Sequence, residues 1–259
     1  MANWRPDQYL LFEEERTRPC RDLAGRVAVE HVQNAIDLGC GTGTSTSVLC
    51  RRWPDARISG LDSSSEMLER ARRDAPQGVW IHGDIAAWSQ GDRDEYDVVF
   101  SNAALHWVQD HAAVYPRLFA RVASGGALAV QVPYNLDSPA HVVMRDLASS
   151  ETWRARFPVG GVRQWFVHEA GFYYDLLAAA ASRIDIWKTT YMQVMPNVEA
   201  IAEWYKGTGM RPFLDALESE AVRAAFISDY VNEIRAEYPV RTDGHVLFPF
   251  RRQFLIAAR

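Results

Sequence analysis

Apolar residues recur along this chain in two patterns, short continuous runs and longer amphipathic stretches. The short runs predict buried strands at residues 34–38, 57–62, 79–82, 96–101 and 127–132. The stretches between them predict helices at residues 44–53, 65–74 and 112–122. Because strands and helices alternate, we expect a parallel sheet covered on both faces, with ligands at the carboxyl ends of the strands.

Further helices and strands are predicted before and after this alternating region. Residues 17–31 predict an amphipathic helix with Pro19 in its first turn. Beyond residue 134 the pattern loosens, with strands expected at 183–194 and 248–257 and helices at 198–206 and 215–238. The expected fold class is α/β, a doubly wound, mostly parallel seven-stranded sheet with helical lid insertions. We expect one domain over residues 1–259, comprising a flap (1–31), a cofactor-binding core (32–134), inserted helical segments (135–181 and 195–247) and final strands (182–194 and 248–259).

Composition narrows the class of protein. The net charge of -5 disfavours a nucleic-acid partner, which calls for a basic surface. The three cysteines are odd in number and lack Cys-x-x-Cys spacing, so we expect neither a disulfide framework nor a metal site, and a reducing, cytoplasmic setting. No apolar run has the length of a signal core or a membrane span, so no membrane association is expected.

The most specific motif lies where the first predicted strand ends, in Gly39-Cys40-Gly41-Thr42-Gly43. Glycine has no Cβ, so these residues let the backbone turn sharply and approach a ligand closely. Asp62 closes the next predicted strand roughly twenty residues later, where a carboxylate can accept hydrogen bonds from both ribose hydroxyls. The pattern predicts a nucleotide pocket; a glycine-rich turn without a ligand is the structural alternative.

The spacing distinguishes between nucleotides. A dinucleotide loop has glycine or alanine three residues after its second glycine, whereas this chain has Thr44 there and an extra glycine at Gly43. The loop resembles the first motif of class I S-adenosylmethionine-dependent methyltransferases. A nicotinamide-dependent oxidoreductase is therefore a weaker hypothesis.

The resemblance extends to later motifs in the same order. It implies that Asp84 accepts from the adenine amine, that Ile85 lies against the ring, and that Asn102 and Ala103 border the methionine moiety. Aromatic faces favour a sulfonium cation, so an aromatic residue is expected beside it, although Trp107 and Met67 could equally pack in the core. The predicted residues for S-adenosylmethionine are Tyr9, Gly39, Cys40, Gly41, Asp62, Ser63, Met67, Asp84, Ile85, Asn102, Ala103 and Trp107.

Segments outside the cofactor motifs resemble the trans-aconitate 2-methyltransferase family over nearly the whole chain. They are residues 4–10, 15–19, 101–108, 128–133, 207–212 and 250–252. This resemblance implies methylation of one carboxylate of a small polycarboxylic acid, trans-aconitate, to a monomethyl ester. A carboxylate is already ionised at pH 7, so positioning suffices and neither a catalytic base nor a metal is expected.

The remaining carboxylates of such a substrate call for arginine or hydroxyl donors. The candidates are Arg16, Tyr134, Arg163 and Arg211, each of which could also be a surface or packed residue. His106 could orient substrate or act as a base on a phenol or quinone, but a capping or surface histidine is the favoured interpretation. A non-catalytic module that binds S-adenosylmethionine remains a further alternative.

Overall fold

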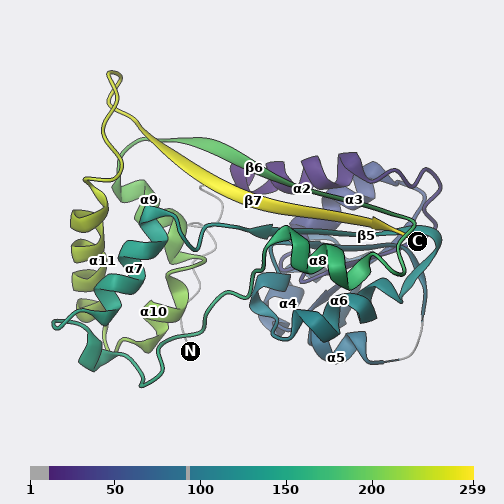
Figure 1. The fold of residues 1–259 in the computed structure, drawn as a ribbon, viewed down its shortest axis with the longest axis horizontal. Helices are drawn as coiled ribbons and strands as arrows, with labels where there is room; N and C mark the ends of the chain where they lie inside the picture. The colour runs from purple at the N-terminus through teal and green to yellow at the C-terminus, as the bar shows by residue number, and fades with distance from the viewer. Residues whose placement is uncertain (1–11, 92–93) are drawn as a thin grey trace. The chain divides into compact units, whose positions relative to one another are not determined.

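The computed structural model describes residues 12–91 and 94–259, apart from the side chain of Glu13. In these residues seven strands form one sheet in the order β3-β2-β1-β4-β5-β7-β6, of which Figure 1 labels β5, β6 and β7. The strands are β1 (Asn34–Leu38), β2 (Arg57–Asp62), β3 (Val79–His82), β4 (Tyr96–Asn102), β5 (Val122–Pro133), β6 (Arg183–Met195) and β7 (Val246–Ala258). The predicted Tyr9 contact lies outside the described residues.

Strands β1 to β5 are parallel, and β1 lies between β2 and β4. Strand β7 joins β5 antiparallel, with Leu128 opposite Ala257. The carboxyl ends of β1 and β2 are side by side because Leu38 is in register with Leu61. The predicted fold class, a mostly parallel seven-stranded sheet, is confirmed, and β5 begins five residues earlier than expected, at Val122 rather than Ala127.

The chain divides into two compact units. In the described residues the sheet unit comprises 16–134, 165–189 and 252–259, and the helical unit comprises 12–15, 135–164 and 190–251. Strands β6 and β7 contribute residues to both units. The division into one domain with inserted lid segments stays a prediction.

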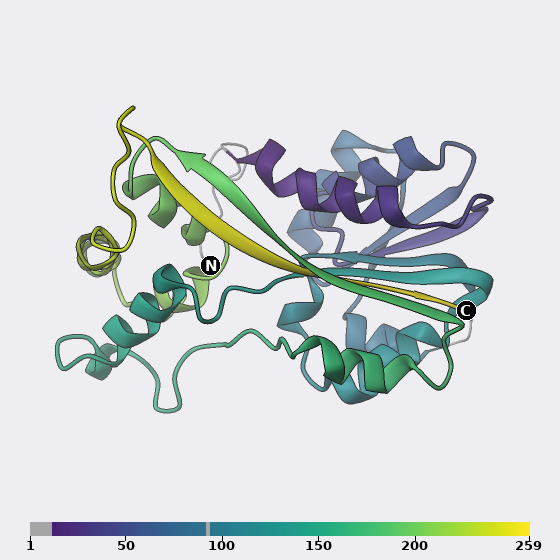
Figure 2. The ribbon, with the colours of Figure 1, turned by 45° about the horizontal axis from the view of Figure 1, so that its top comes forward.

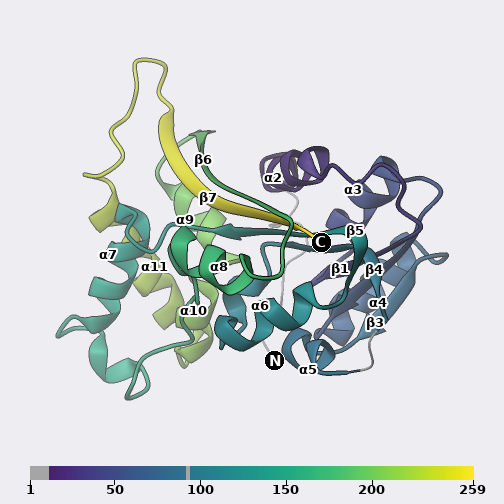
Figure 3. The same cartoon turned by 45° about the vertical axis from the view of Figure 1, so that its right-hand side comes forward.

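Helices cover both faces of the sheet unit (Figures 2 and 3). One face packs Ile36, Val99 and Leu128 against Tyr115 and Tyr173 in one apolar cluster. On the other face, α3 donates hydroxyl hydrogen bonds to Asp37. The helices of this unit are α2 (Glu13–Arg26), apart from its first three residues, and α3 (Thr44–Arg52), α4 (Ser65–Asp74), α5 (Ile85–Ser89), η1 (Leu105–Trp107), α6 (His111–Phe119) and α8 (Ala170–Leu177).

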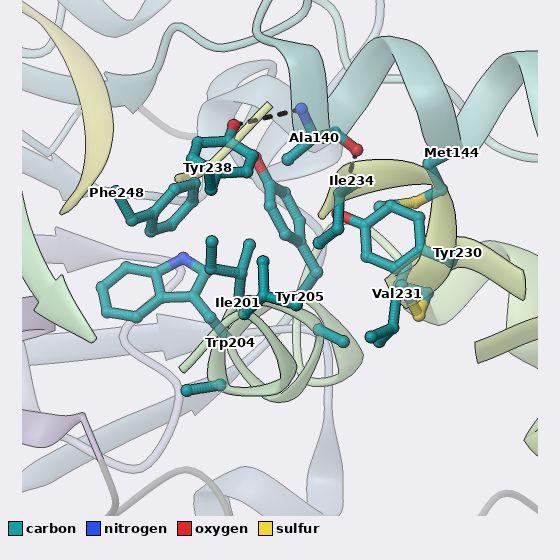
Figure 4. Close-up of a cluster of buried hydrophobic side chains, with 14 of the residues drawn as sticks. Ala140, Met144, Ile201, Trp204, Tyr205, Tyr230, Val231, Ile234, Tyr238 and Phe248 are labelled. Carbon is teal, nitrogen blue, oxygen red and sulfur yellow. Dashed lines mark hydrogen bonds between the residues drawn. The ribbon is translucent and has the colours of Figure 1, made fainter. Parts of the chain in front are cut away.

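The helical unit has an aromatic core (Figure 4). Tyr230 donates from its hydroxyl to the Ala140 carbonyl oxygen at 3.0 Å, and the Ala140 amide donates to the Tyr238 hydroxyl at 3.2 Å. Trp204 and Phe248 pack edge to face, with ring centroids 6.0 Å apart. Two buried tyrosines thus meet the polar groups of one backbone position inside an apolar cluster. The helices of the helical unit are α7 (Pro139–Ser149), η2 (Arg154–Arg156), α9 (Glu199–Lys206), α10 (Arg211–Ala216) and α11 (Glu220–Ile234).

Three predicted helices have the wrong limits, the first being the one predicted at 112–122, which is α6 and ends at Phe119. The stretch at 215–238 is broken between α10 and α11, because Ser219 caps α11 by accepting a hydrogen bond from the Val222 amide, and α11 ends at Ile234. The N-terminal helix begins at Glu13, upstream of residue 17, and ends at Arg26. Pro19 therefore lies inside α2 and not in its first turn. Helices α5, α7 and α8 were not predicted, since five to eleven residues give little room for a 3.6-residue period.

Candidate functional site

The three glycines after β1 all adopt the left-handed region, with φ of +76° at Gly39, +56° at Gly41 and +87° at Gly43. A Cβ on Gly39 would lie 2.1 Å from the Ala104 Cβ, and one on Gly43 would lie 2.7 Å from the Trp80 ring. A Cβ on Gly41 would meet no described atom within 4 Å. Gly39 and Gly43 are thus required for packing, whereas Gly41 leaves its side of the loop open to a ligand.

Asp62 connects this loop to the end of β2. Its Oδ2 accepts a hydrogen bond from the Gly41 amide at 2.8 Å, and its Oδ1 accepts from the Ser64 amide at 2.8 Å. Each carboxylate oxygen has a second lone pair, so the group keeps capacity for two more donors. A carboxylate held by the loop itself fits a ligand with vicinal hydroxyls.

Asp37 is a buried carboxylate that the sequence analysis did not select. Its side chain is fully buried in β1, and Oδ2 accepts from the hydroxyls of Ser45 at 2.6 Å and Thr46 at 2.7 Å. Burial raises the pKa of this carboxyl from 3.8 to about 6, against the lowering effect of the two hydroxyls. Oδ1 has no hydrogen-bond partner among the described residues, so a cationic group such as a ligand ammonium fits it. The sequence signal that could have identified Asp37 is an acidic residue inside an apolar strand.

The turns after β2 and β3 carry the predicted adenine contacts. Ser63 is exposed, while Ser64 caps α4 by accepting a hydrogen bond from the Met67 amide. Asp84 is exposed and caps α5, with Oδ1 accepting from the Ala87 amide at 2.9 Å. Ile85 is buried, and its Cδ1 lies 3.6 Å from where a Cβ on Gly39 would stand. Ile85 therefore packs beside the glycine loop.

The turn after β4 is strained. Ala103 has a φ of +55°, which non-glycine residues rarely adopt, and its amide donates to the Gln131 carbonyl oxygen at 2.9 Å. Ser101 Oγ donates to the Leu38 carbonyl oxygen at 2.9 Å, which joins the end of β4 to the end of β1. Asn102 Oδ1 is buried and has no partner among the described residues. Strained backbone and an unmet acceptor at one strand end are typical of a binding site.

Three aromatic rings gather just beyond this turn. The His106 ring centroid lies 4.9 Å from that of Trp107 and 5.0 Å from that of Trp165, and the two indoles are 6.0 Å apart. His106 is only 4% exposed, so its interpretation as a surface histidine is wrong. Trp165 was not predicted, because only tertiary packing brings it to η1. This aromatic cluster suits a desolvated cation.

A buried hydrogen-bond chain supports η1 from α6 and α8. His111 lies 2.9 Å from the Leu105 carbonyl oxygen through Nε2 and 2.9 Å from the Tyr173 hydroxyl through Nδ1. A carbonyl only accepts, so Nε2 carries the proton and Nδ1 accepts from Tyr173. The Tyr173 oxygen in turn accepts from the His168 amide at 3.2 Å. Burial lowers the pKa of His111, in keeping with this neutral tautomer.

Two predicted substrate residues belong to the sheet unit. Arg16 is half-buried in α2. Tyr134 follows β5 and donates its hydroxyl to Glu169, while Lys188 Nζ lies 3.8 Å from its ring centroid. Lys188 also pairs with Glu169 at 2.9 Å. The Tyr134 hydroxyl is therefore already a hydrogen-bond donor to a neighbouring carboxylate.

The other two predicted substrate residues belong to the helical unit. Arg163 is exposed, and Arg211 Nε lies 3.5 Å from Asp215 Oδ2 one turn along α10. The predicted convergence of these arginines with Arg16 on one substrate stays a prediction.

The described residues contain no group of three or more His, Cys, Asp or Glu side chains placed to hold a metal ion. No helix among residues 12–91 and 94–259 combines the length and apolarity needed to cross a bilayer. Cys20, Cys40 and Cys50 are free thiols, and burial raises the pKa of all three.

Comparison with known proteins defines the class. A family model described as a methyltransferase domain matches residues 35–126, which include the glycine loop, Asp62 and the turn after β4. The YcgJ protein of Bacillus subtilis superposes with a TM-score of 0.59 at 16% identity, covering 95% of this chain and 99% of its own. A Haemonchus contortus phosphoethanolamine N-methyltransferase 2 gives 0.58 at 14% identity, covering 93% of this chain and 52% of its own. The fold and loop are those of a Rossmann-like methyltransferase.

Full-length relatives define the family within that class. Two proteins named trans-aconitate 2-methyltransferase match, one from Azoarcus sp. (strain BH72) at 45% identity and one from Rhodopseudomonas palustris (strain BisB5) at 42%, each over all of both chains. The chain belongs to the trans-aconitate 2-methyltransferase family. The predicted enzyme class, a methyltransferase, is thereby confirmed.

Proposed function

We propose that this chain transfers the methyl group of S-adenosylmethionine to one carboxylate of trans-aconitate, giving a monomethyl ester. The observation that carries the proposal is the 45% identity over the full length of a relative bearing that activity in its name. Because the identity covers both units, it includes the segments outside the cofactor-binding half of the chain.

We assign each part of S-adenosylmethionine to residues at the end of a strand, according to the chemistry of their side chains. Asp62 would accept from the ribose hydroxyls, with Ser63 beside it and the backbone of Gly39, Cys40 and Gly41 lying along the ligand. Asp84, Ile85 and Met67 would surround adenine. The unmet oxygens of Asp37 and Asn102, with Ala103, would take the amino-acid moiety, and Trp107 would face the sulfonium. Tyr9 remains in this proposed set.

The reaction needs little from protein side chains. S-adenosylmethionine supplies an electrophilic methyl group on a sulfonium. A carboxylate oxygen of the acceptor forms a bond to the methyl carbon while the carbon–sulfur bond breaks and its electron pair stays on sulfur, leaving S-adenosylhomocysteine. Opposite charges neutralise one another in this step, so a dry, aromatic environment favours it. Arg16, Arg163 and Arg211 are the proposed donors to the remaining carboxylates, and the Tyr134 hydroxyl would join them only by exchanging its present acceptor, Glu169, for the substrate.

The direct test is turnover. The purified chain, incubated with S-adenosylmethionine and trans-aconitate, should yield a base-labile methyl ester and one equivalent of S-adenosylhomocysteine. Related di- and tricarboxylates serve as competing acceptors. Tight S-adenosylhomocysteine binding without methylation of any small carboxylic acid would reject the acceptor and favour a non-catalytic binding module. We place the reaction in the cytoplasm, in keeping with three free thiols.

A further inference from the structure

Gln131 is a fully buried glutamine whose amide is unmet. It lies on β5, and neither its Oε1 nor its Nε2 has a hydrogen-bond partner among the described residues. Its register partner on the parallel strand β4 is Asn102, whose Oδ1 is buried and unmet in the same way. Two adjacent amides with unsatisfied polar atoms therefore lie together near the carboxyl ends of two parallel strands.

Strand alternation places these side chains on one face of the sheet. Val130 and Val132 belong to the apolar cluster on one face, so Gln131 between them points to the opposite face, as does Asn102. The backbone of Gln131 is also fixed, because its carbonyl oxygen accepts from the amide of the strained residue Ala103. The glutamine is thus part of the same strand-end construction as the proposed methyl-transfer site.

A buried amide without partners lowers stability. Leaving a polar group unpaired in the interior costs free energy that an apolar side chain of similar shape does not. Gln253, on the neighbouring strand β7, shows the structural alternative, since its Nε2 donates to the His168 carbonyl oxygen at 3.1 Å. The Oε1 of Gln253 is unmet, but its Nε2 holds the fold through His168, whereas neither polar atom of the Gln131 amide has a contact within the described residues.

Its place in the strand order indicates which ligand it meets. The glycine loop and Asp62 follow β1 and β2, and β4 lies between β1 and β5. Gln131 is therefore on the side of Asn102 away from the cofactor loop, where the methyl acceptor must lie if the donor occupies β1, β2 and β4. A carboxylate is acceptor-only and needs donors, and a neutral amide supplies one without adding charge beside a sulfonium.

We infer that Gln131 is a specificity-determining residue of the acceptor site, where its Nε2 donates to a carboxylate oxygen that is not methylated. Its Oε1 then accepts from a second donor in the same site. This inference rests on the proposed function, since it requires a carboxylic acid as the methyl acceptor.

The test separates acceptor binding from cofactor binding and from stability. Gln131→Leu removes both polar atoms at similar volume, and Gln131→Met, which keeps the unbranched shape, serves if the leucine variant does not fold. We expect the KM for trans-aconitate to rise at least tenfold, the dissociation constant of S-adenosylhomocysteine to stay within twofold, and the melting temperature to stay equal or rise. The matched control, Gln253→Leu, should lower the melting temperature and leave that KM within twofold.

The results that would overturn the inference differ from the result that would reject the proposed function. An unchanged KM in an active Gln131→Leu protein overturns the inference and leaves a buried water as the amide's partner. A lowered melting temperature with cofactor affinity and KM weakened together also overturns it, because that is the signature of a structural role. If the unmodified protein binds S-adenosylhomocysteine but methylates no carboxylic acid, the proposed function itself fails, a result that no Gln131 variant is needed to obtain.

Discussion

Gly41 and Gly39 illustrate how neighbouring glycines meet different requirements. Both have positive φ, yet a Cβ on Gly39 would overlap the Ala104 Cβ, and one on Gly41 would enter open space. Asp62 adds a second requirement, since its carboxylate accepts from the Gly41 amide and so fixes the loop. At this scale, the proposed cofactor site consists of a few backbone atoms and one carboxylate.

Substitution of these glycines should separate binding from folding. Gly41→Ala should weaken S-adenosylhomocysteine binding more than tenfold and lower the free energy of unfolding by only about 1–2 kcal/mol, the strain of a positive φ. Gly39→Ala adds a 2.1 Å clash to the same strain and should destabilise the fold much more. Calorimetric titration and denaturant unfolding measure the two quantities. Equal losses of stability would show that Gly41 is also a packing glycine.

Asp62→Ala should weaken S-adenosylhomocysteine binding more than tenfold, because it removes both the proposed ribose acceptor and the Gly41 contact. Asp243→Ala, an exposed aspartate in the helical unit, is the control and should bind normally. Calorimetric titration of both variants provides the comparison. Unchanged affinity in Asp62→Ala would remove this carboxylate from the site.

Buried Asp37 should make stability depend on pH. Its folded pKa of about 6 lies above the ordinary 3.8, so the folded protein binds this proton more tightly than the unfolded chain. The resulting stabilisation is complete below pH 3.8 and is lost as pH rises through 6, by up to about 3 kcal/mol. The free energy of unfolding of the unmodified protein relative to Asp37→Asn should therefore fall between pH 4 and 7. Denaturant titrations at each pH test this, and a difference that stays flat would contradict it.

At the scale of elements, the turn between β4 and α6 depends on a helix from a distant part of the chain. His111 on α6 donates to Leu105 in η1, and Tyr173 on α8 donates to His111 while accepting from the His168 amide. Helix α8 therefore braces the turn that carries Asn102 and the aromatic cluster. A buried chain of this kind is stable only when every member is present.

Tyr173→Phe should lower the free energy of unfolding by about 1–3 kcal/mol, because it leaves His111 Nδ1 and the His168 amide without their partner. The adjacent Tyr174 is 53% exposed, so Tyr174→Phe is the matched control and should change stability by less than about 0.5 kcal/mol. Denaturant unfolding monitors both variants. Equal stabilities would mean that water replaces the hydroxyl.

At the scale of the whole molecule, the methyl acceptor determines whether the reaction requires a catalytic base. A carboxylate with an ordinary pKa near 4 is ionised throughout the neutral range, so no protein group has to remove a proton. The two units together match the family over its full length, which extends the assignment from cofactor to acceptor.

The pH dependence of turnover should follow from this. With a carboxylate acceptor, kcat/KM should be nearly constant from pH 6 to 8.5. With a phenol or quinone acceptor and His106 as the base, the rate would instead rise with pH as that histidine loses its proton. Initial rates at saturating S-adenosylmethionine distinguish the two, and a tenfold rise over this range would reject the carboxylate mechanism.

Much of the sheet unit is readable from the sequence. The limits of β1, β2 and β3 are those predicted, because each is a short apolar run with a polar end, and the glycine spacing selected the cofactor because a missing Cβ is a local property. Less of the helical unit could be predicted from the sequence. Its α10–α11 break depends on one capping serine, and α7 lies in a region without clear alternation.

The sequence by itself determined the alternation of strands and helices, the glycine loop and the acid that follows it, since these depend on residues near one another in the chain. Only the tertiary structure decided that His106 is buried against Trp165, that Asp37 carries a raised pKa, and that the amide of Gln131 is unmet. Burial and hydrogen-bond satisfaction depend on what distant segments bring to a position, and residue types in order along a chain do not specify that.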